Sequence, residues 1–184
     1  MSVLINNAGL GGGGPFNLSS DEDTGNLVSV NILHPTYLTK VYLNHCLNRN
    51  QKSCIINVGS LMELHPFPGY CMYSSSKAFI NNFSRAIWAE VNFDPTLNKK
   101  VDVFLWSPSF ISTKINGMNV VWGLIPDPLS ACETAMHDVG RFSSTHGRWF
   151  DAVQASFILF LGKYWPSVLE SRMYKRAMRK HLKK

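Results

Sequence analysis

The chain has 184 residues, of which 45% are hydrophobic and 12% aromatic. This composition is typical of one globular domain and excludes a disordered chain or a coiled coil. The formal net charge is +6, but residues 172–184 hold seven basic residues and no acidic one, whereas residues 1–171 hold 11 basic and 12 acidic residues. A nucleic-acid-binding domain would spread its positive charge over a face, so a basic end on a neutral body argues against a nucleic-acid partner.

The first half of the chain predicts one strand and one long helix. Residues 3–5 are an apolar run with β-branched residues, and a polar and glycine-rich segment follows them, which predicts a short buried strand ending in a loop. Apolar residues recur at helical spacing over residues 21–47, with Ser20 and Asp21 available as caps. We expect Pro35 to bend this helix rather than to end it.

The remaining elements alternate in type. Apolar runs at 54–58 and 101–106 predict two more strands, and the spacing over 74–91 predicts a helix between them. This alternation is typical of an α/β fold with a parallel sheet. Further helices are predicted at 130–139, 153–162 and 167–182, and a short strand at 148–150. The four cysteines form no C-x-x-C pair and have no nearby histidine at metal-ligand spacing, so we expect neither a zinc site nor a disulfide framework.

The glycine-rich loop is the first candidate for a ligand site. Gly9, Gly11 and Gly14 formally match G-x-G-x-x-G, and a predicted strand precedes them. That motif must open a helix whose N-terminus receives a pyrophosphate, but residues 15–18 intervene before any helical pattern begins. We therefore interpret the segment as a flexible loop rather than a phosphate-binding loop.

The strongest chemical signal lies between residues 57 and 77. Tyr73 and Lys77 are four residues apart, so they share one face of the predicted helix. A cation beside a phenol favours the phenolate and brings its pKa towards the range useful for proton transfer. Ser60 follows the preceding strand and could direct its hydroxyl to the same place. The alternative, a solvated helix face, is common for a tyrosine and a lysine at this spacing.

Several motifs in order resemble the short-chain dehydrogenase/reductase family over nearly the whole chain. Val-Leu-Ile-Asn-Asn-Ala-Gly at 3–9 resembles the family's N-N-A-G strand, and Asn31 in Val-Ser-Val-Asn resembles its helix asparagine. Ser60 stands 13 residues before Tyr73, the family's usual spacing, and Lys77 completes the Y-x-x-x-K motif. The resemblance begins in the middle of the family's fold. It therefore implies a Rossmann-like doubly wound parallel sheet that lacks its first β-α-β-α-β part.

The resemblance implies hydride transfer between a nicotinamide cofactor and a carbonyl carbon. Tyr73 would be the acid/base, Ser60 would hydrogen-bond the substrate oxygen, and Lys77 would lower the pKa of Tyr73 and hold the nicotinamide ribose. Asn31 would anchor a proton-relay water. The residues expected to bind the cofactor are Asn7, Ala8, Gly9, Tyr73, Lys77, Pro108 and Thr113. Ser109 stands where the family usually has glycine in its P-G-x-x-x-T stretch.

A narrower resemblance, carried by residues 108–114, 126–134 and 164–184, points to the branch that contains very-long-chain 3-oxoacyl-CoA reductase and 17β-hydroxysteroid dehydrogenases types 3 and 12. It implies reduction of a keto group on a lipid substrate in fatty acid elongation or steroid metabolism, with NADP(H) expected and NAD(H) as the alternative. It also implies the cytosolic face of the endoplasmic reticulum membrane, with a cytoplasmic location otherwise. The apolar residues between 110 and 125 would line a substrate cleft or belong to the core. The basic end at 172–184 would lie on anionic lipid or form a solvated helix.

Two classes of function follow. The first is an oxidoreductase, with residues 1–184 forming a single partial domain, the catalytic half, and the basic helix 167–184 at its end. The family's phosphate-binding segment is absent, so we expect this chain alone to bind NADPH very weakly, and we expect strand 3–5 to have a bare apolar edge. The second is a truncated, non-catalytic chain that binds lipid or a partner protein. The family commonly forms homodimers through the helices expected at 28–47 and 74–91.

Overall fold

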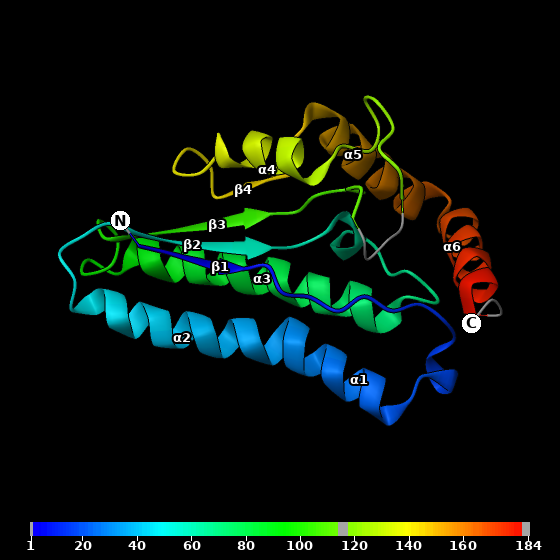
Figure 1. The fold of residues 1–184 in the computed structure, drawn as a ribbon, viewed down its shortest axis with the longest axis horizontal. Coiled ribbons are helices and arrows are strands. Elements are labelled where there is room, and N and C mark those ends of the chain that lie inside the picture. Colours follow the sequence, from blue (N-terminus) through cyan, green and yellow to red (C-terminus); the bar gives the residue numbers. More distant parts are fainter. Residues whose placement is uncertain (1, 114–117, 182–184) are drawn as a thin grey trace.

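The computed structural model describes residues 2–113 and 118–181. Its centre is a four-stranded parallel sheet with the order β1 (Ser2–Asn6), β2 (Ser53–Val58), β3 (Val101–Trp106) and β4 (Ser144–Thr145). The three strands predicted from apolar runs are therefore confirmed, each within two residues at either end. Parallel strands require crossover connections, and helices supply the first two of them (Figure 1).

The helical segment predicted at 21–47 continues past Pro35, as expected, but it is not regular. It consists of α1 (Asp21–Val28), a π-helical turn at Ser29–Leu33 and α2 (His34–Leu47). The Ser20 hydroxyl caps α1 by accepting a hydrogen bond from the backbone N–H of Asp23 at 3.0 Å. The second crossover helix is α3 (Cys71–Phe93). In Figure 1, α1, α2 and α3 lie together on one face of the sheet.

The last third of the chain differs from the prediction in one place. Its helices are α4 (Pro128–Met136), α5 (Trp149–Tyr164) and α6 (Pro166–His181). Earlier in the chain, two short 3-10 turns lie at Phe16–Leu18 and Leu61–Glu63. The strand expected at 148–150 is wrong, because Arg148 is the N-cap of α5 and the fourth strand is Ser144–Thr145. Within the described residues, no helix is both long enough and apolar enough to cross a bilayer.

Alternate residues of the strands point to two separate cores. On one face, Cys54, Ile56, Phe104 and Trp106 pack with Ala131 and Ala135 of α4. On the other face, Ile55, Val101 and Val103 pack with Cys46 of α2 and Val91 of α3. Burial on both faces explains why β2 and β3 consist of nearly continuous apolar residues instead of alternating with polar ones.

The edge of the sheet at β1 is exposed. Among the described strands, β1 pairs only with β2, and Val3 and Ile5 are 46% and 57% exposed. Their register partners Cys54 and Ile56 belong to the core on the α4 side. Val3 and Ile5 therefore lie on the same face of the sheet, but their side chains remain exposed. The bare apolar edge expected for strand 3–5 is confirmed.

Candidate active site

Ser60 sits where β2 ends. The strand stops at Val58, and the buried Gly59 leads to Ser60, the N-cap of the 3-10 turn Leu61–Glu63. The Ser60 hydroxyl accepts a hydrogen bond from the backbone N–H of Met62 at 3.2 Å, while the Glu63 carboxylate accepts one from the Ser60 N–H at 3.2 Å. This reciprocal arrangement is a capping box, and it holds Ser60 at the carboxyl edge of the sheet, where ligands of open α/β folds bind.

Tyr73 and Lys77 come from the first two turns of α3. The Ser60 side chain lies close enough to the Tyr73 hydroxyl to lower its pKa as a hydrogen-bond partner. The Lys77 ammonium lies 5.8 Å from the centre of the Tyr73 ring and donates a hydrogen bond to the Val58 carbonyl at 2.8 Å. Lys77 is only 7% exposed. The structure thus brings Ser60, Tyr73 and Lys77 together at one end of β2, although 17 sequence positions separate the first from the last.

The electrostatics of this group differ from the expectation that Lys77 lowers the pKa of Tyr73. Burial raises the pKa of Tyr73 above its usual range; the hydrogen bond with Ser60 lowers it, and the charge of Glu63 raises it further. Burial also lowers the pKa of Lys77 from 10.5 to about 8, against the charge of Glu63, which raises it. The expected lowering is therefore not observed, because desolvation of the phenol dominates.

Asn31 lies in the π-helical turn between α1 and α2, and such turns are often found at functional sites. Its side-chain oxygen accepts a hydrogen bond from the Leu10 N–H at 2.8 Å, and its amide donates to the Leu10 carbonyl at 2.9 Å and to the Ser76 hydroxyl at 3.0 Å. The Ser76 hydroxyl in turn donates to the Tyr73 carbonyl. Asn31 therefore links the loop after β1 to the helix that carries Tyr73.

Of the residues expected to hold a nicotinamide, the loop at 7–9 lies close to Lys77. A Cβ placed on Gly9 would lie 3.8 Å from the Lys77 nitrogen and 3.7 Å from the Asn31 oxygen, so the loop after β1 passes close to the ammonium. Asn7 and Ala8 are exposed beside it, and Pro108 is buried, with its carbonyl accepting a hydrogen bond from the Leu61 N–H at 3.0 Å. Thr113 is partly buried at the end of the first described range.

These residues fit a polyhydroxyl group of a cofactor. A lysine ammonium has three donors, and within the described residues one is used by Val58. The remaining donors of this buried ammonium lie beside the loop at residues 7–9, where the hydroxyls of a ribose could accept hydrogen bonds from them. The glycine-rich loop that follows is not the start of a helix, since a 3-10 turn and Ser20 precede α1, in agreement with the rejection of a phosphate-binding loop.

A cleft of about 530 Å³ opens beside Tyr73. Its walls are the glycine-rich segment 10–16, parts of α1, and residues 69–73, which lead into α3. The Gly14 N–H donates to the Gly69 carbonyl at 2.8 Å and joins two of these walls. The residues between 110 and 125 that were candidates for a substrate cleft do not line this one. Trp122 there is 95% exposed in a turn, and Ile111 packs against the core.

Helix α6 packs against the loop that joins Ser60 to Tyr73, a contact that no sequence pattern indicated. His65 of the loop contacts Glu170 at 3.2 Å, and a Cβ on Gly69 would lie 2.4 Å from the Cβ of Ala177. The exposed basic residues of this helix are Arg172, Lys175, Arg176 and Arg179. Lys183 and Lys184, part of the expected basic end, lie outside the described residues, and so does Lys114.

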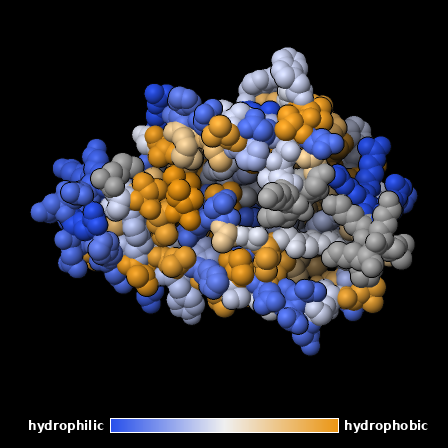
Figure 2. Space-filling model, viewed as in Figure 1, coloured by the Kyte–Doolittle hydropathy of each residue, from blue (hydrophilic) through white to orange (hydrophobic). Residues whose placement is uncertain are grey.

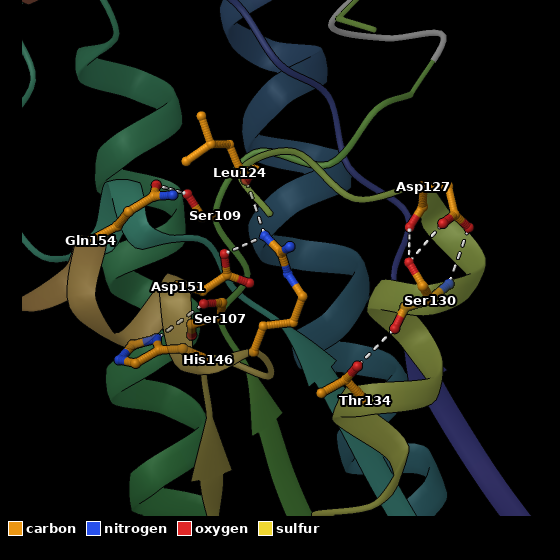
Figure 3. Close-up of polar contacts among 10 residues, drawn as sticks. Ser107, Ser109, Leu124, Asp127, Ser130, Thr134, His146, Asp151 and Gln154 are labelled. Atoms are coloured by element: carbon orange, nitrogen blue, oxygen red, sulfur yellow. Dashed lines mark hydrogen bonds and ion pairs between the residues drawn. The ribbon is translucent and has the colours of Figure 1, made fainter. Parts of the chain in front are cut away.

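Polar contacts connect α5 and the residues before it to the segment after β3 (Figure 3). The Ser107 carbonyl, at the end of β3, contacts the His146 ring at 3.0 Å, and the Ser109 hydroxyl donates to the Gln154 side chain of α5. The Arg148 guanidinium donates to both Asp151 and the Leu124 carbonyl at 3.0 Å. Ser109, which stands in place of the family's usual glycine, thus has a structural partner of its own.

Comparison with known proteins identifies relatives for most of the chain. Residues 1–121 match the family model described as short chain dehydrogenase. A very-long-chain 3-oxoacyl-CoA reductase of Anas platyrhynchos is 28% identical over 80% of this chain and 46% of its own length. The 17-beta-hydroxysteroid dehydrogenase type 3 of Mus musculus is 34% identical over 61% and 36%. An "Inactive hydroxysteroid dehydrogenase-like protein 1" of Homo sapiens is 25% identical over 98% and 54%. The chain spans about half the length of the curated relatives it matches.

Solved structures share the fold. A 7beta-hydroxysteroid dehydrogenase matches with a TM-score of 0.74 and 17% identity over 86% of this chain and 62% of that one. A 4-hydroxyisoleucine dehydrogenase complexed with NADH matches with a TM-score of 0.55 and 26% identity over 61% and 47%. The expected Rossmann-like parallel sheet is confirmed by these matches and by the strand pairing.

Proposed function

Because the chain belongs to the short-chain dehydrogenase family, we propose that it serves in the reduction of a keto group on a lipid substrate, a 3-oxoacyl-CoA or a 17-oxosteroid. NADP(H) is the proposed cofactor, with NAD(H) as the alternative. The observation that carries the proposal is that Ser60 and Tyr73 lie beside each other next to the buried Lys77, at the edge of a cleft of about 530 Å³. The names of the reductase and hydroxysteroid dehydrogenase relatives support the substrate class.

A bound nicotinamide would supply the hydride, and the residues proposed to hold it are Asn7, Ala8, Gly9, Tyr73, Lys77, Pro108 and Thr113. Tyr73 would donate a proton to the carbonyl oxygen as negative charge develops there. Its raised pKa keeps the phenol protonated at neutral pH, which suits a general acid. Ser60 would hydrogen-bond the same oxygen, and Lys77 would hold the ribose hydroxyls. Asn31 would position the loop after β1 and anchor a relay water.

The experiment is an NADPH-oxidation assay with a 3-oxoacyl-CoA and a 17-oxosteroid as substrates, at a high NADPH concentration because this chain alone is expected to bind NADPH very weakly. We expect Tyr73→Phe to lower turnover by about a hundredfold or more, because a positioned general acid contributes about that much. Tyr37→Phe is the matched control, since Tyr37 is 63% exposed on α2 and should retain the activity. Turnover that survives Tyr73→Phe would remove Tyr73 from the mechanism.

The second candidate function is a non-catalytic chain that binds lipid or a partner protein. One relative, aligned over 98% of this chain, carries the word inactive in its name. The same assay separates the two functions, because the second predicts no NADPH oxidation with either substrate and saturable binding of a fluorescent fatty acyl probe. Binding that survives Tyr73→Phe while turnover is absent throughout would favour the second function.

We further propose contact with the anionic cytosolic face of the endoplasmic reticulum membrane. Exposed apolar residues recur on one face of α5 at helical spacing: Trp149, Val153, Phe157, Phe160 and Tyr164. Hydrophobic atoms gather in Figure 2 over the region that α5 occupies in Figure 1, and the exposed basic residues of α6 follow directly in the chain. An apolar helix face with aromatic residues, next to lysines and arginines, suits a lipid interface.

The test is sedimentation with phosphatidylcholine vesicles, with and without phosphatidylserine. We expect binding only when phosphatidylserine is present, and we expect Phe157→Glu to abolish it. Phe93→Glu is the control, because Phe93 is 88% exposed at the end of α3, away from α5 in sequence. Equal binding to both vesicle types would contradict an electrostatic contribution.

A homodimer through α2 and α3 is also proposed. Exposed apolar side chains lie on both helices, including Tyr37, Val41 and Trp88, and burial of such residues stabilises association. Light scattering should give twice the mass of one chain, and Val41→Glu should return it to the monomer mass. A monomeric wild-type protein would exclude this assembly.

A further inference from the structure

Glu63 is a partly buried carboxylate that the proposed chemistry does not use. Its two oxygens are engaged by different elements: Oε2 accepts a hydrogen bond from the Ser60 backbone N–H at 3.2 Å, and Oε1 accepts one from the Asn81 side-chain amide at 2.7 Å. Asn81 lies on α3, eight residues after Tyr73, so about 12 Å along the helix axis separate the two. One side chain therefore joins the turn that carries Ser60 to the helix that carries Tyr73.

The space around this carboxylate is tightly filled. A Cβ on Gly59 would lie 2.5 Å from both Glu63 Oε2 and the Ser107 hydroxyl, so a larger residue at position 59 would displace one of them. Hydrogen bonds hold Glu63 from two elements, its own turn and α3, and the Ser107 hydroxyl at the end of β3 lies close to it. These contacts leave the carboxylate little freedom to move.

Several titratable groups surround Glu63. Tyr73 and Lys77 are close enough on α3 for the Glu63 charge to raise the pKa of each. His146, which follows β4 and contacts the Ser107 carbonyl, lowers the pKa of Glu63 by its charge. Burial, the largest effect, raises the pKa of Glu63, and the hydrogen bonds from Ser107, Ser60 and Asn81 lower it. The negative charge of Glu63 therefore acts on the same two groups to which the proton chemistry is assigned.

We propose that Glu63 is a positioning residue: its carboxylate joins the Ser60 backbone to Asn81 of α3, and in this way it sets the Ser60 hydroxyl beside the Tyr73 hydroxyl and places a negative charge near that phenol. This inference rests on the proposed function, since it assigns to Glu63 a role that acts through Ser60 and Tyr73. A glutamine has the same shape but no charge, and its amide cannot accept the hydrogen bonds that both carboxylate oxygens accept.

The test compares the wild-type chain with Glu63→Gln and with Glu90→Gln. Glu90 lies on α3 and is exposed, so its variant removes the same charge from a solvated position. In the NADPH-oxidation assay, Glu63→Gln should lower kcat about tenfold, the scale expected when reacting groups are misplaced, and should leave the KM for NADPH unchanged. Because the Glu63 charge raises the pKa of Tyr73, the loss of activity at alkaline pH should begin at lower pH in Glu63→Gln. A purely structural role would lower kcat at every pH without moving that limb.

Tyrosine ¹³Cζ NMR titration measures the same effect without turnover. The pKa of Tyr73, assigned with Tyr73→Phe, should fall in Glu63→Gln and stay unchanged in Glu90→Gln. If Glu63→Gln does not fold, an NMR titration of the wild-type protein tests the proposal instead. The amide resonance of Ser60 should then follow the titration of the Glu63 carboxyl. An unmoved Tyr73 pKa in a folded Glu63→Gln, or a Ser60 amide that ignores the Glu63 titration, overturns the proposal. Absence of turnover in the wild type rejects the proposed function instead.

Discussion

Replacing Lys77 with methionine should stabilise the fold while removing a proposed catalytic group. Burial lowers the pKa of Lys77 from 10.5 to about 8, and one pKa unit corresponds to about 1.4 kcal/mol. At about pH 7 the buried ammonium therefore destabilises the folded state by about 3 kcal/mol relative to an exposed lysine. Methionine also loses the hydrogen bond to the Val58 carbonyl, a loss of about 1 kcal/mol. The expected gain in the free energy of unfolding is about 2 kcal/mol.

The pH dependence distinguishes this effect from simple repacking. Between the two pKa values the unfolded chain binds more protons than the folded one, so wild-type stability rises with pH in that window. The destabilisation due to Lys77 should fall from about 3 to about 1.5 kcal/mol between about pH 7 and about pH 9.5. Urea unfolding at both pH values should show the gap between Lys77→Met and the wild type narrowing.

Lys40→Met is the control for that measurement, because Lys40 is an exposed lysine on α2. Its unfolding free energy should follow the wild type at both pH values. A Lys77→Met protein less stable than the wild type at about pH 7, or a gap that does not change with pH, would show that burial of the ammonium does not destabilise this fold.

The other predictions concern packing, the sheet edge and thiol chemistry. Gly69 has φ +79° and no room for a Cβ against Ala177, so Gly69→Ala should lower the unfolding free energy by about 2 kcal/mol or more, whereas Gly11→Ala, with open space around it, should be nearly neutral in the same urea titration. Ile5→Lys should reduce light scattering on heating, because a charge on an exposed edge strand opposes edge-to-edge pairing. The buried Cys54 thiol, with a pKa of about 12, should react with Ellman's reagent only after denaturation; reaction in the native protein would contradict its burial.

Local pattern was sufficient for most of the elements but not for the last strand. The runs at 54–58 and 101–106 are buried on both faces, so their apolar continuity is visible in the sequence. The fourth strand has two residues, Ser144 and Thr145, and exists only because they pair with Leu105 and Trp106. No local signal marks such a strand, and the pattern at 148–150 pointed to the wrong place.

The candidate active site likewise has a part that the sequence predicts and a part that only the fold decides. The spacing of Tyr73 and Lys77 on one helix face follows from helix geometry, whereas the walls of the cleft come from segments that meet only in the folded chain. The described apolar residues near Trp122 lie outside the walls of that cleft, because apolar composition does not say which segments enclose a given space. Glu63 could have been found, since Ser-x-x-Glu at 60–63 is a capping-box pattern, but its link to Asn81 could not.

The sequence by itself determined most of the strands and helices and that Ser60, Tyr73 and Lys77 follow one another at the spacing of a known family, because periodicity and motif spacing are properties of neighbouring residues. Only the tertiary structure decided how deeply those groups are buried. Burial reverses the expected direction of the Tyr73 pKa and brings the pKa of Lys77 to about 8. The physical reason is that desolvation depends on everything packed around a group, including Glu63 and the end of β3, and not on the residues beside it in the chain.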